Sequence, residues 1–189
     1  MKTTTSTQVT HYEIQKKRRE SLLEEWRGYH KTIIKRNDVE LVESPTRRTR
    51  RGVYAGWDGD RPTKNLDATL HEIDPGVTTT SHRHSWDAIM FIESGSGWTE
   101  IDGQRVDWKP WDTIHLPSWA WHRHGNEGSK TAVFHTWSVQ PMLEQFGVAL
   151  LEEGGDTLHA ELPPRPKQVE ALTGDDPYAR RTQRLARQW

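Results

Sequence analysis

The chain has 189 residues, no cysteine and a formal net charge of −1 at pH 7. The lack of cysteine excludes disulfide scaffolds, thiolate zinc sites, iron–sulfur clusters and cysteine nucleophiles, so a metal site would have to use His, Asp or Glu. The near-neutral charge gives no electrostatic reason to expect a nucleic acid or an anionic membrane as partner. Because no apolar run reaches the length of a transmembrane helix and residues 1–10 lack the apolar core of a signal peptide, we expect a soluble cytoplasmic protein.

The N-terminal region, residues 1–51, is expected to hold a polar tail, one helix and a basic connector. Residues 12–36 have a loose apolar stripe that includes Leu22 and Leu23, with charged residues between, which is typical of an amphipathic helix. The basic run 47–51 then interrupts the pattern. We interpret this run as a solvated connector, with an anion-binding or partner-facing edge as the alternative.

Short strands separated by Gly, Pro or Asp turns fill residues 52–147, which predicts an all-β domain. The clearest hairpin joins residues 98–101 to residues 104–108 through Asp102-Gly103, the residue pair that a tight two-residue turn favours. Three further runs have strand character: 88–92, 112–116 and 131–138. Residues 148–189 turn polar and are expected to form a C-terminal tail, with a Pro-rich linker and short helices at 168–172 and 178–188.

Two His-x-His pairs in the β-rich region are the strongest functional signal. His82 and His84 lie one residue apart, and His122 and His124 repeat the arrangement about forty residues later. Since alternate residues of a strand share a face, each pair can direct both imidazoles to one side. Three imidazoles around one metal leave up to three coordination positions open, as an oxygen-activating iron site requires. An isolated histidine is more often structural, which is the simpler interpretation of the remaining histidines in this region: His71, His115 and His135.

The residues around these pairs resemble the two motifs of the cupin superfamily. Gly76, His82, His84 and Gly95 fall on the first motif, with Ala88 at its glutamate position, and Pro117, His122 and Asn126 fall on the second, with Trp111 and Trp119 at its glycine positions. The resemblance implies an all-β fold, a cupin jelly-roll barrel with the metal inside, flanked here by an N-terminal helix and a short C-terminal helical tail.

With the glutamate ligand absent, the chain is similar to the gentisate and salicylate 1,2-dioxygenase group, also through the string Trp-His-Arg-His-Gly-Asn at 121–126. This resemblance implies Fe(II) held by His82, His84 and His122, with O₂ as co-substrate and a hydroxylated aromatic compound as substrate. It further implies that His124 contacts the substrate as a hydrogen-bond partner or proton shuttle.

The resemblance also directs attention to the substrate side of the site. Met90 occupies the position where that group has an arginine that holds the aromatic carboxylate, so Arg83, Arg105 or Arg123 would have to replace it. The expected substrate-binding residues are Trp121, Trp119, Met90, Arg83, His135 and Asn126.

Other functions stay open from the sequence. Mn, Zn or Ni in the same site would indicate a lyase or isomerase, and other three-histidine cupins are thiol or diketone dioxygenases. A non-catalytic cupin that binds a small ligand is a further alternative. We expect a homodimer or higher homo-oligomer, and neither nucleic acid nor membrane as a partner.

Overall fold

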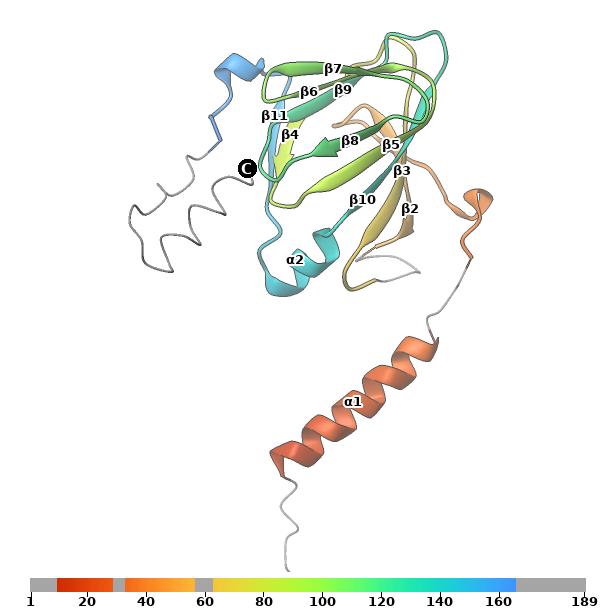
Figure 1. Cartoon of the computed structure of the whole chain (residues 1–189), viewed down its shortest axis with the longest axis vertical. Coiled ribbons are helices and arrows are strands. Elements are labelled where there is room, and N and C mark those ends of the chain that lie inside the picture. The colour runs from red at the N-terminus through yellow and green to blue at the C-terminus, as the bar shows by residue number, and fades with distance from the viewer. Residues whose placement is uncertain (1–9, 29–32, 57–62, 166–189) are drawn as a thin grey trace, which may run out of the picture.

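The computed structural model describes residues 10–28, 33–56 and 63–165, in which two antiparallel β-sheets face each other across a barrel (Figure 1). The first sheet has the strand order β1 (Val42–Ser44), β2 (Thr49–Ala55), β3 (Asp67–Ile73), β10 (Ala132–Ser138), β5 (Ala88–Ser94) and β8 (Thr113–Leu116). The second has the order β11 (Leu151–Gly155), β4 (Ser81–His84), β9 (His122–Gly125), β6 (Gly97–Ile101) and β7 (Gln104–Trp108). The predicted all-β barrel is therefore confirmed.

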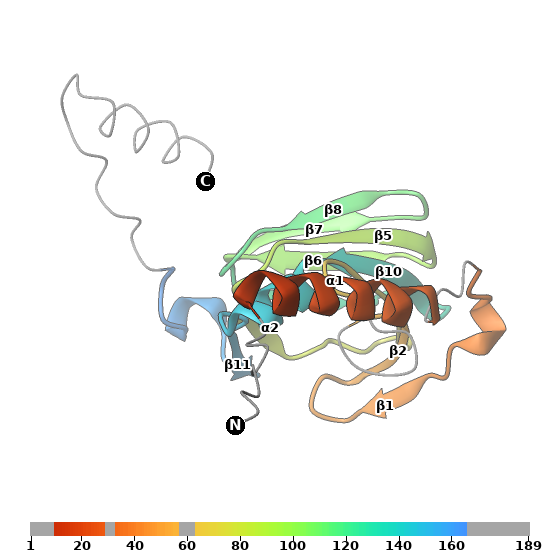
Figure 2. The same cartoon turned by 90° about the horizontal axis from the view of Figure 1, so that it is seen from below.

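Two α-helices accompany the barrel in the described residues. Helix α1 (His11–Gly28) lies apart from the sheets in Figure 1, and in the view from below in Figure 2 it lies in front of the barrel. Helix α2 (Gln140–Phe146) follows β10. The N-terminal helix was expected to continue to residue 36, but α1 ends at Gly28, and Arg36–Asp38 instead form a turn of 3₁₀ helix. A second 3₁₀ turn, His159–Glu161, follows β11. The helices expected at 168–172 and 178–188 lie outside the described residues.

Backbone conformation at the turns agrees with the motifs. Asp102 and Gly103 join β6 to β7 with φ of 45° and 80°, the left-handed pair that a two-residue hairpin turn needs. Trp111 and Trp119, at the glycine positions of the second motif, also adopt left-handed backbone, with φ of 77° and 62°. A non-glycine residue pays conformational energy in this region, so both tryptophans are held there by their surroundings.

The basic run at 47–51 belongs to the barrel and is not a solvated connector. Strand β2 begins at Thr49, and the guanidinium of Arg50 forms ion pairs with Glu72 at 3.0 Å and Asp74 at 2.7 Å. Arg48, in the turn before β2, pairs with Asp156 at 2.6 Å. The barrel strands thus extend beyond the expected range 52–147, with β1 and the first three residues of β2 before it and β11 after it.

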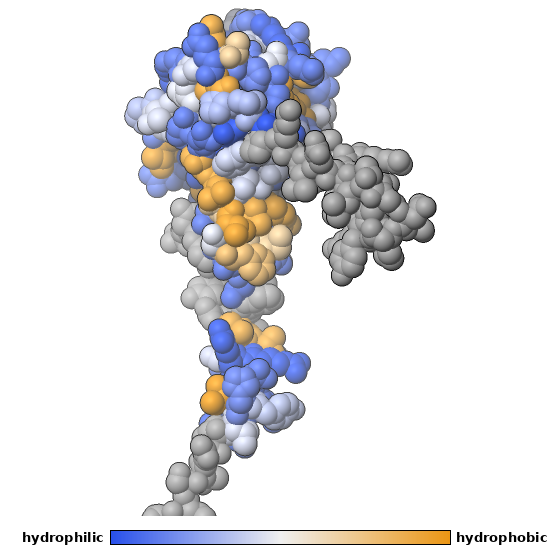
Figure 3. Space-filling view, turned by 90° about the vertical axis from the view of Figure 1, so that its left-hand side faces the viewer, coloured by the Kyte–Doolittle hydropathy of each residue, from blue (hydrophilic) through white to orange (hydrophobic). Residues whose placement is uncertain are grey.

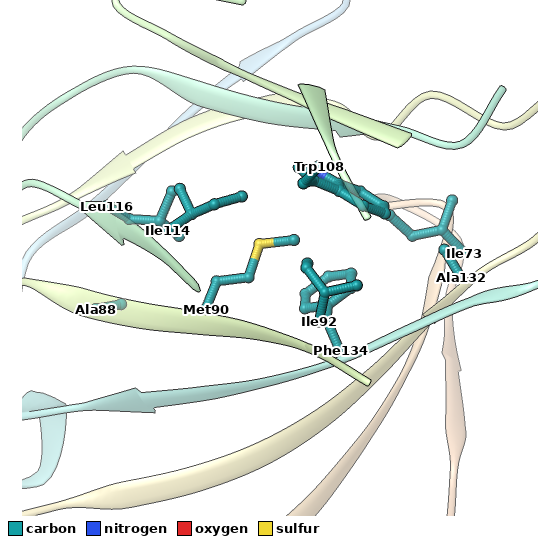
Figure 4. Close-up of a cluster of buried hydrophobic side chains, with 9 residues drawn as sticks. All are labelled: Ile73, Ala88, Met90, Ile92, Trp108, Ile114, Leu116, Ala132 and Phe134. Carbon is teal, nitrogen blue, oxygen red and sulfur yellow. The ribbon is translucent and has the colours of Figure 1, made fainter. Parts of the chain in front are cut away.

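An apolar core fills the barrel interior next to a cavity. Met90 lies at its centre and has no exposed surface (Figure 4). Fully burying a side chain of this size stabilises the fold by roughly 1.5–3 kcal/mol. The core consists of Ile73, Ala88, Met90, Ile92, Trp108, Ile114, Leu116, Ala132 and Phe134. Three of these residues, Ala88, Leu116 and Phe134, also line the cavity, so the core supports one of its walls.

Apolar side chains also gather on the outside, over α2 and the segment after it (Figure 3). The exposed members are Met142, Phe146, Val148, Leu150 and Leu151. Within the described residues, neither α-helix combines the length and the apolar composition needed to span a bilayer.

Candidate metal centre

Two adjacent strands of the second sheet bring three histidines together. His82 and His84 alternate with Arg83 on β4, so both imidazoles face the barrel interior. His122 begins β9 and is the register partner of His82. One ring nitrogen from each histidine lies within 4.8 Å of the others, close enough for all three to bind one ion.

Backbone carbonyls orient two of the rings. The carbonyl oxygen of Trp86 lies 2.7 Å from Nδ1 of His84, and that of Ala120 lies 2.8 Å from Nδ1 of His122. Since a carbonyl only accepts, each Nδ1 carries the proton and leaves Nε2 with a free lone pair. The indole of Trp86 also stacks on His84, with ring centroids 4.4 Å apart.

The site leaves buried nitrogens without a hydrogen bond. Within the described part of the chain, Nε2 of His122 and Nδ1 of His82 are buried and unpartnered. Buried polar atoms are almost always paired, so these two atoms call for a ligand. A divalent metal ion satisfies them, because neutral imidazole is among the commonest metal ligands.

Burial keeps the rings neutral. It lowers the pKa of His84 to about 4 and holds the pKa values of His82 and His122 well below the ordinary value, with the neighbouring imidazoles adding to the effect. At neutral pH all three rings are therefore neutral, with one nitrogen free to bind, which is the state that binds a metal.

His124 lies beside the three histidines but is held differently. Its Nδ1 is 2.9 Å from the hydroxyl oxygen of Thr99, which also accepts a hydrogen bond from the indole of Trp108 at 3.0 Å. Burial lowers the pKa of His124 to about 3, so its ring is also neutral at pH 7. The ring centroid is 5.9 Å from that of His122, and His124 lines the cavity next to the ligands.

The cavity has a volume of about 310 Å³, at the lower end of the range for small-molecule sites. The first sheet forms the wall opposite the histidine strands, and Arg47, Arg51 and His71 lie in that wall. The remaining lining residues are Ser44, Thr49, Asp67, Thr69, Thr79, Trp86, Ala88, Leu116, Phe134, Thr136, Ser138, Gln140 and Leu151, together with the four histidines already described.

The six residues expected to bind substrate lie outside this cavity, which changes the expected composition of its wall. On the strands the cause is alternation: Arg83 faces away from the cavity because its neighbours His82 and His84 face into it, and His135 does so because Phe134 and Thr136 line it. Met90 packs in the apolar core. Trp119 and Trp121 pack against the guanidinium of Arg83, and the side-chain amide of Asn126 donates to backbone carbonyl oxygens.

Sequence reasoning missed the residues of the opposite wall. Arg47, Thr49 and Arg51 alternate, as do Thr69 and His71, and each set lines the cavity. If the basic run is interpreted as a strand, this period of two places Arg47, Thr49 and Arg51 on the same face of the sheet. His71 stacks on Phe134 with ring centroids 5.0 Å apart, and burial lowers its pKa to about 3.

Comparison with known proteins agrees with this geometry. The family model described as "Cupin domain" matches residues 69–138. Gentisate 1,2 dioxygenase 1 of Aquipseudomonas alcaligenes is 34% identical over 99 residues, which are 52% of this chain and 28% of that protein. A gentisate 1,2-dioxygenase of Streptomyces is 30% identical over 113 residues, or 59% and 32% of the two chains. The chain thus spans about a third of the length of these relatives.

A solved structure gives the same result for the fold. Salicylate 1,2-dioxygenase of Pseudoaminobacter salicylatoxidans in complex with gentisate superimposes with a TM-score of 0.53 at 18% identity, over 77% of this chain and 37% of that one. Residues 69–138 therefore match the cupin domain model and include the three-histidine cluster, and about half of the chain is similar in sequence to gentisate 1,2-dioxygenases.

Proposed function

We propose that this chain is an Fe(II)-dependent dioxygenase that opens the ring of a hydroxylated aromatic carboxylate with O₂. One observation carries the proposal: three neutral imidazoles, two buried and one half-buried, converge on one point and face a cavity whose opposite wall presents two arginines. The relationship to ring-cleaving dioxygenases supports the same reaction class.

The donor set fits iron. His82, His84 and His122 would hold the ion, and no Asp or Glu joins this cluster among the described residues. Three protein ligands leave positions for a chelating substrate and for O₂. A bound Fe(II) would supply the activation of O₂ and the transfer of its atoms to the ring.

The arginines explain how a carboxylate could bind although Met90 replaces the arginine of the related enzymes. Arg51 lines the cavity, where burial raises the pKa of the nearby Asp67 carboxyl and the charge of Arg51 partly opposes this effect, but among the described residues it forms no hydrogen bond or ion pair with a carboxylate. Arg47 donates to Glu153 at 2.7 Å and adds a second positive charge to the cavity wall. Asp67 is the one acidic side chain in the lining, and it accepts a hydrogen bond from the backbone of Ser138 at 2.8 Å. The wall therefore favours an anion, and a guanidinium binds a carboxylate through two parallel hydrogen bonds.

The remaining cavity residues suit an aromatic ring with a hydroxyl group. Trp86, Leu116 and Phe134 supply apolar surface on which a ring can pack. His124, neutral and fixed by Thr99, is placed to hold the proton of a ring hydroxyl. Neutral imidazole can accept such a proton and return it later in the reaction.

Metal analysis and oxygen uptake test the proposal together. Protein purified without added metal should contain iron, and after Fe(II) loading it should consume O₂ with gentisate, salicylate or 1-hydroxy-2-naphthoate. Hydroquinone, which is gentisate without the carboxylate, is the matched control and should react with a much higher KM. Bound zinc, manganese or nickel without oxygen uptake would instead indicate a metal-dependent lyase or isomerase. Absence of any bound metal, with binding of an aromatic ligand, would indicate a non-catalytic cupin.

A further inference from the structure

The residue between the two histidines of β4 is buried on the outer side of the sheet. Arg83 is 5% exposed, and its guanidinium lies against two indoles, 4.8 Å from the ring centroid of Trp119 and 4.5 Å from that of Trp121. It pairs with Glu152, its register partner on β11, at 2.6 Å. The planar guanidinium thus has two aromatic neighbours and one carboxylate partner.

Both indoles belong to the segment that leads into the third ligand. Trp121 directly precedes His122, and the backbone N–H of Trp119 donates to the carbonyl oxygen of His84 at 2.7 Å. Arg83 therefore links the strand that carries two metal ligands to the segment that carries the third. Residues of the first His-x-His pair and of the second are fixed relative to each other through this side chain.

The C-terminal segment completes the contact. Residues 162–165, which we call the strap, cross the outside of this sheet, and Arg83 donates to the carbonyl oxygens of Pro163 at 3.2 Å and Pro164 at 3.3 Å. The indole N–H of Trp121 donates to the same Pro163 oxygen at 2.7 Å. At its end, the strap is held by an ion pair between Arg165 and Asp102.

The second His-x-His pair offers a comparison within the same chain. Arg123 stands between His122 and His124 as Arg83 stands between His82 and His84, but its side chain is 21% exposed against 6%. It pairs with Glu100, its own register partner on β6, at 3.1 Å and lies 5.8 Å from the ring centroid of Trp98. In the portion of the chain that the structure describes, no side-chain hydrogen bond or ion pair joins it to the strap or to β4. The two arginines share sequence context and charge and differ in what they connect.

A buried guanidinium is a poor choice for stability alone, because apolar residues of similar volume often stabilise a fold as well or better. Its planar, multidentate donors instead define one geometry. We propose that Arg83 is a positioning residue. With its guanidinium held by hydrogen bonds to the strap, it fixes the separation between the His82–His84 strand and His122, and thereby sets the affinity for the metal. The proposal rests on the three-histidine metal site of the proposed function but not on its reaction.

Cobalt(II) binding to the full-length, metal-free protein tests this role. Co(II) gives a visible spectrum that reports coordination, and competition with a chelator gives its Kd. Removing a group that orients metal ligands typically lowers affinity about 10- to 100-fold. We expect Arg83→Met to weaken Co(II) binding at least about tenfold and to change the spectrum, and Arg83→Lys to rescue little, because an ammonium cannot make the same set of contacts.

Arg123→Met is the matched control and should stay within about threefold of wild type, because Arg123 does not connect the ligand strands. Trp121→Phe removes the indole hydrogen bond to the strap but keeps an aromatic ring, smaller than the indole, beside Arg83, and should weaken Co(II) binding by a smaller factor than Arg83→Met. Urea unfolding of each metal-free variant identifies any variant that does not fold. If Arg83→Met does not fold, the Co(II) affinities of Trp121→Phe and Arg83→Lys test the proposal instead. Wild-type Kd and spectrum in folded Arg83→Met, or an equal loss in Arg123→Met, would overturn the proposal. Tight Co(II) binding by a wild-type protein without oxygenase activity would refute the proposed reaction and leave the role of Arg83 supported.

Discussion

Arg51 offers the sharpest test of substrate recognition. The substitution Arg51→Gln removes the positive charge and keeps a polar but shorter side chain. Among the described residues, Arg51 interacts with the Asp67 carboxyl only at longer range and forms no salt bridge, so the variant breaks no close ion pair of the barrel. Its expected effect is therefore on substrate and not on folding.

The magnitude follows from the surroundings of the guanidinium. A hydrogen bond to a charged group contributes about 1.5–3 kcal/mol, and the lower half of that range applies because Arg51 is exposed on the cavity side. About 1.5–2 kcal/mol corresponds to a loss of roughly 10- to 30-fold in kcat/KM. Arg47 remains in the same wall, so binding of the carboxylate is weakened and not abolished.

Paired substrates isolate the interaction. We expect kcat/KM for gentisate to fall in Arg51→Gln while that for hydroquinone changes less than about threefold, because hydroquinone has no carboxylate to lose. Arg105→Gln is the control: Arg105 lies on β7, pairs with Asp107 and Glu127, and does not line the cavity. Equal losses for both substrates, or no loss for either, would show that Arg51 does not recognise the carboxylate.

Three further predictions concern the core, the cavity wall and His124. In urea titrations, Met90→Ala should lower the free energy of unfolding by about 2–5 kcal/mol, whereas Ile89→Ala on the outer face should lower it by about 1 kcal/mol or less. A changed KM with unchanged stability in Met90→Ala would instead place Met90 at the substrate. His71 has a folded pKa of about 3, below its unfolded value, so its contribution to stability is complete above about pH 6.5 and is lost as pH falls. His71→Asn should therefore reduce the difference in unfolding free energy between pH 7 and pH 5 by up to about 2 kcal/mol, and an unchanged difference would contradict the buried neutral ring. Thr99→Val should lower kcat without changing Co(II) affinity, because it releases His124 and leaves the metal ligands in place; weaker Co(II) binding would argue against that separation of roles.

Local patterns predicted those parts of the site that lie close together in the sequence. The alternation His82-Arg83-His84 places two ligands on one face, and Asp102-Gly103 sets the β6–β7 hairpin, so both follow from backbone geometry alone. The pairing of His82 with His122 is longer in range, and the cupin motifs provided it.

The opposite wall could not be predicted in this way, because the cavity forms only when the two sheets face each other. Arg51 enters it through the pairing of β2 with β3, where it lies opposite His71, twenty residues later in the chain. Motif matching predicted that Met90 contacts the substrate, but its side chain packs in the apolar core, because a shared strand position does not guarantee that a side chain reaches the cavity. The strap was interpreted as a stiff linker, and nothing in its composition indicates that its carbonyl groups bond to Arg83.

The single registered pair between β4 and β9, His82 with His122, has a consequence for the lifetime of the protein in a cell. An ion bound there ties the two strands together at the point where their ladder is shortest. At a free metal concentration of a hundred times Kd, such binding adds about 2.7 kcal/mol to the folded state. On the proposed function the metal is iron, and a chain synthesised when iron is scarce would lack this increment and populate opened forms more often, which proteases degrade. The abundance of the protein should therefore follow the supply of its metal, even where its synthesis is constant.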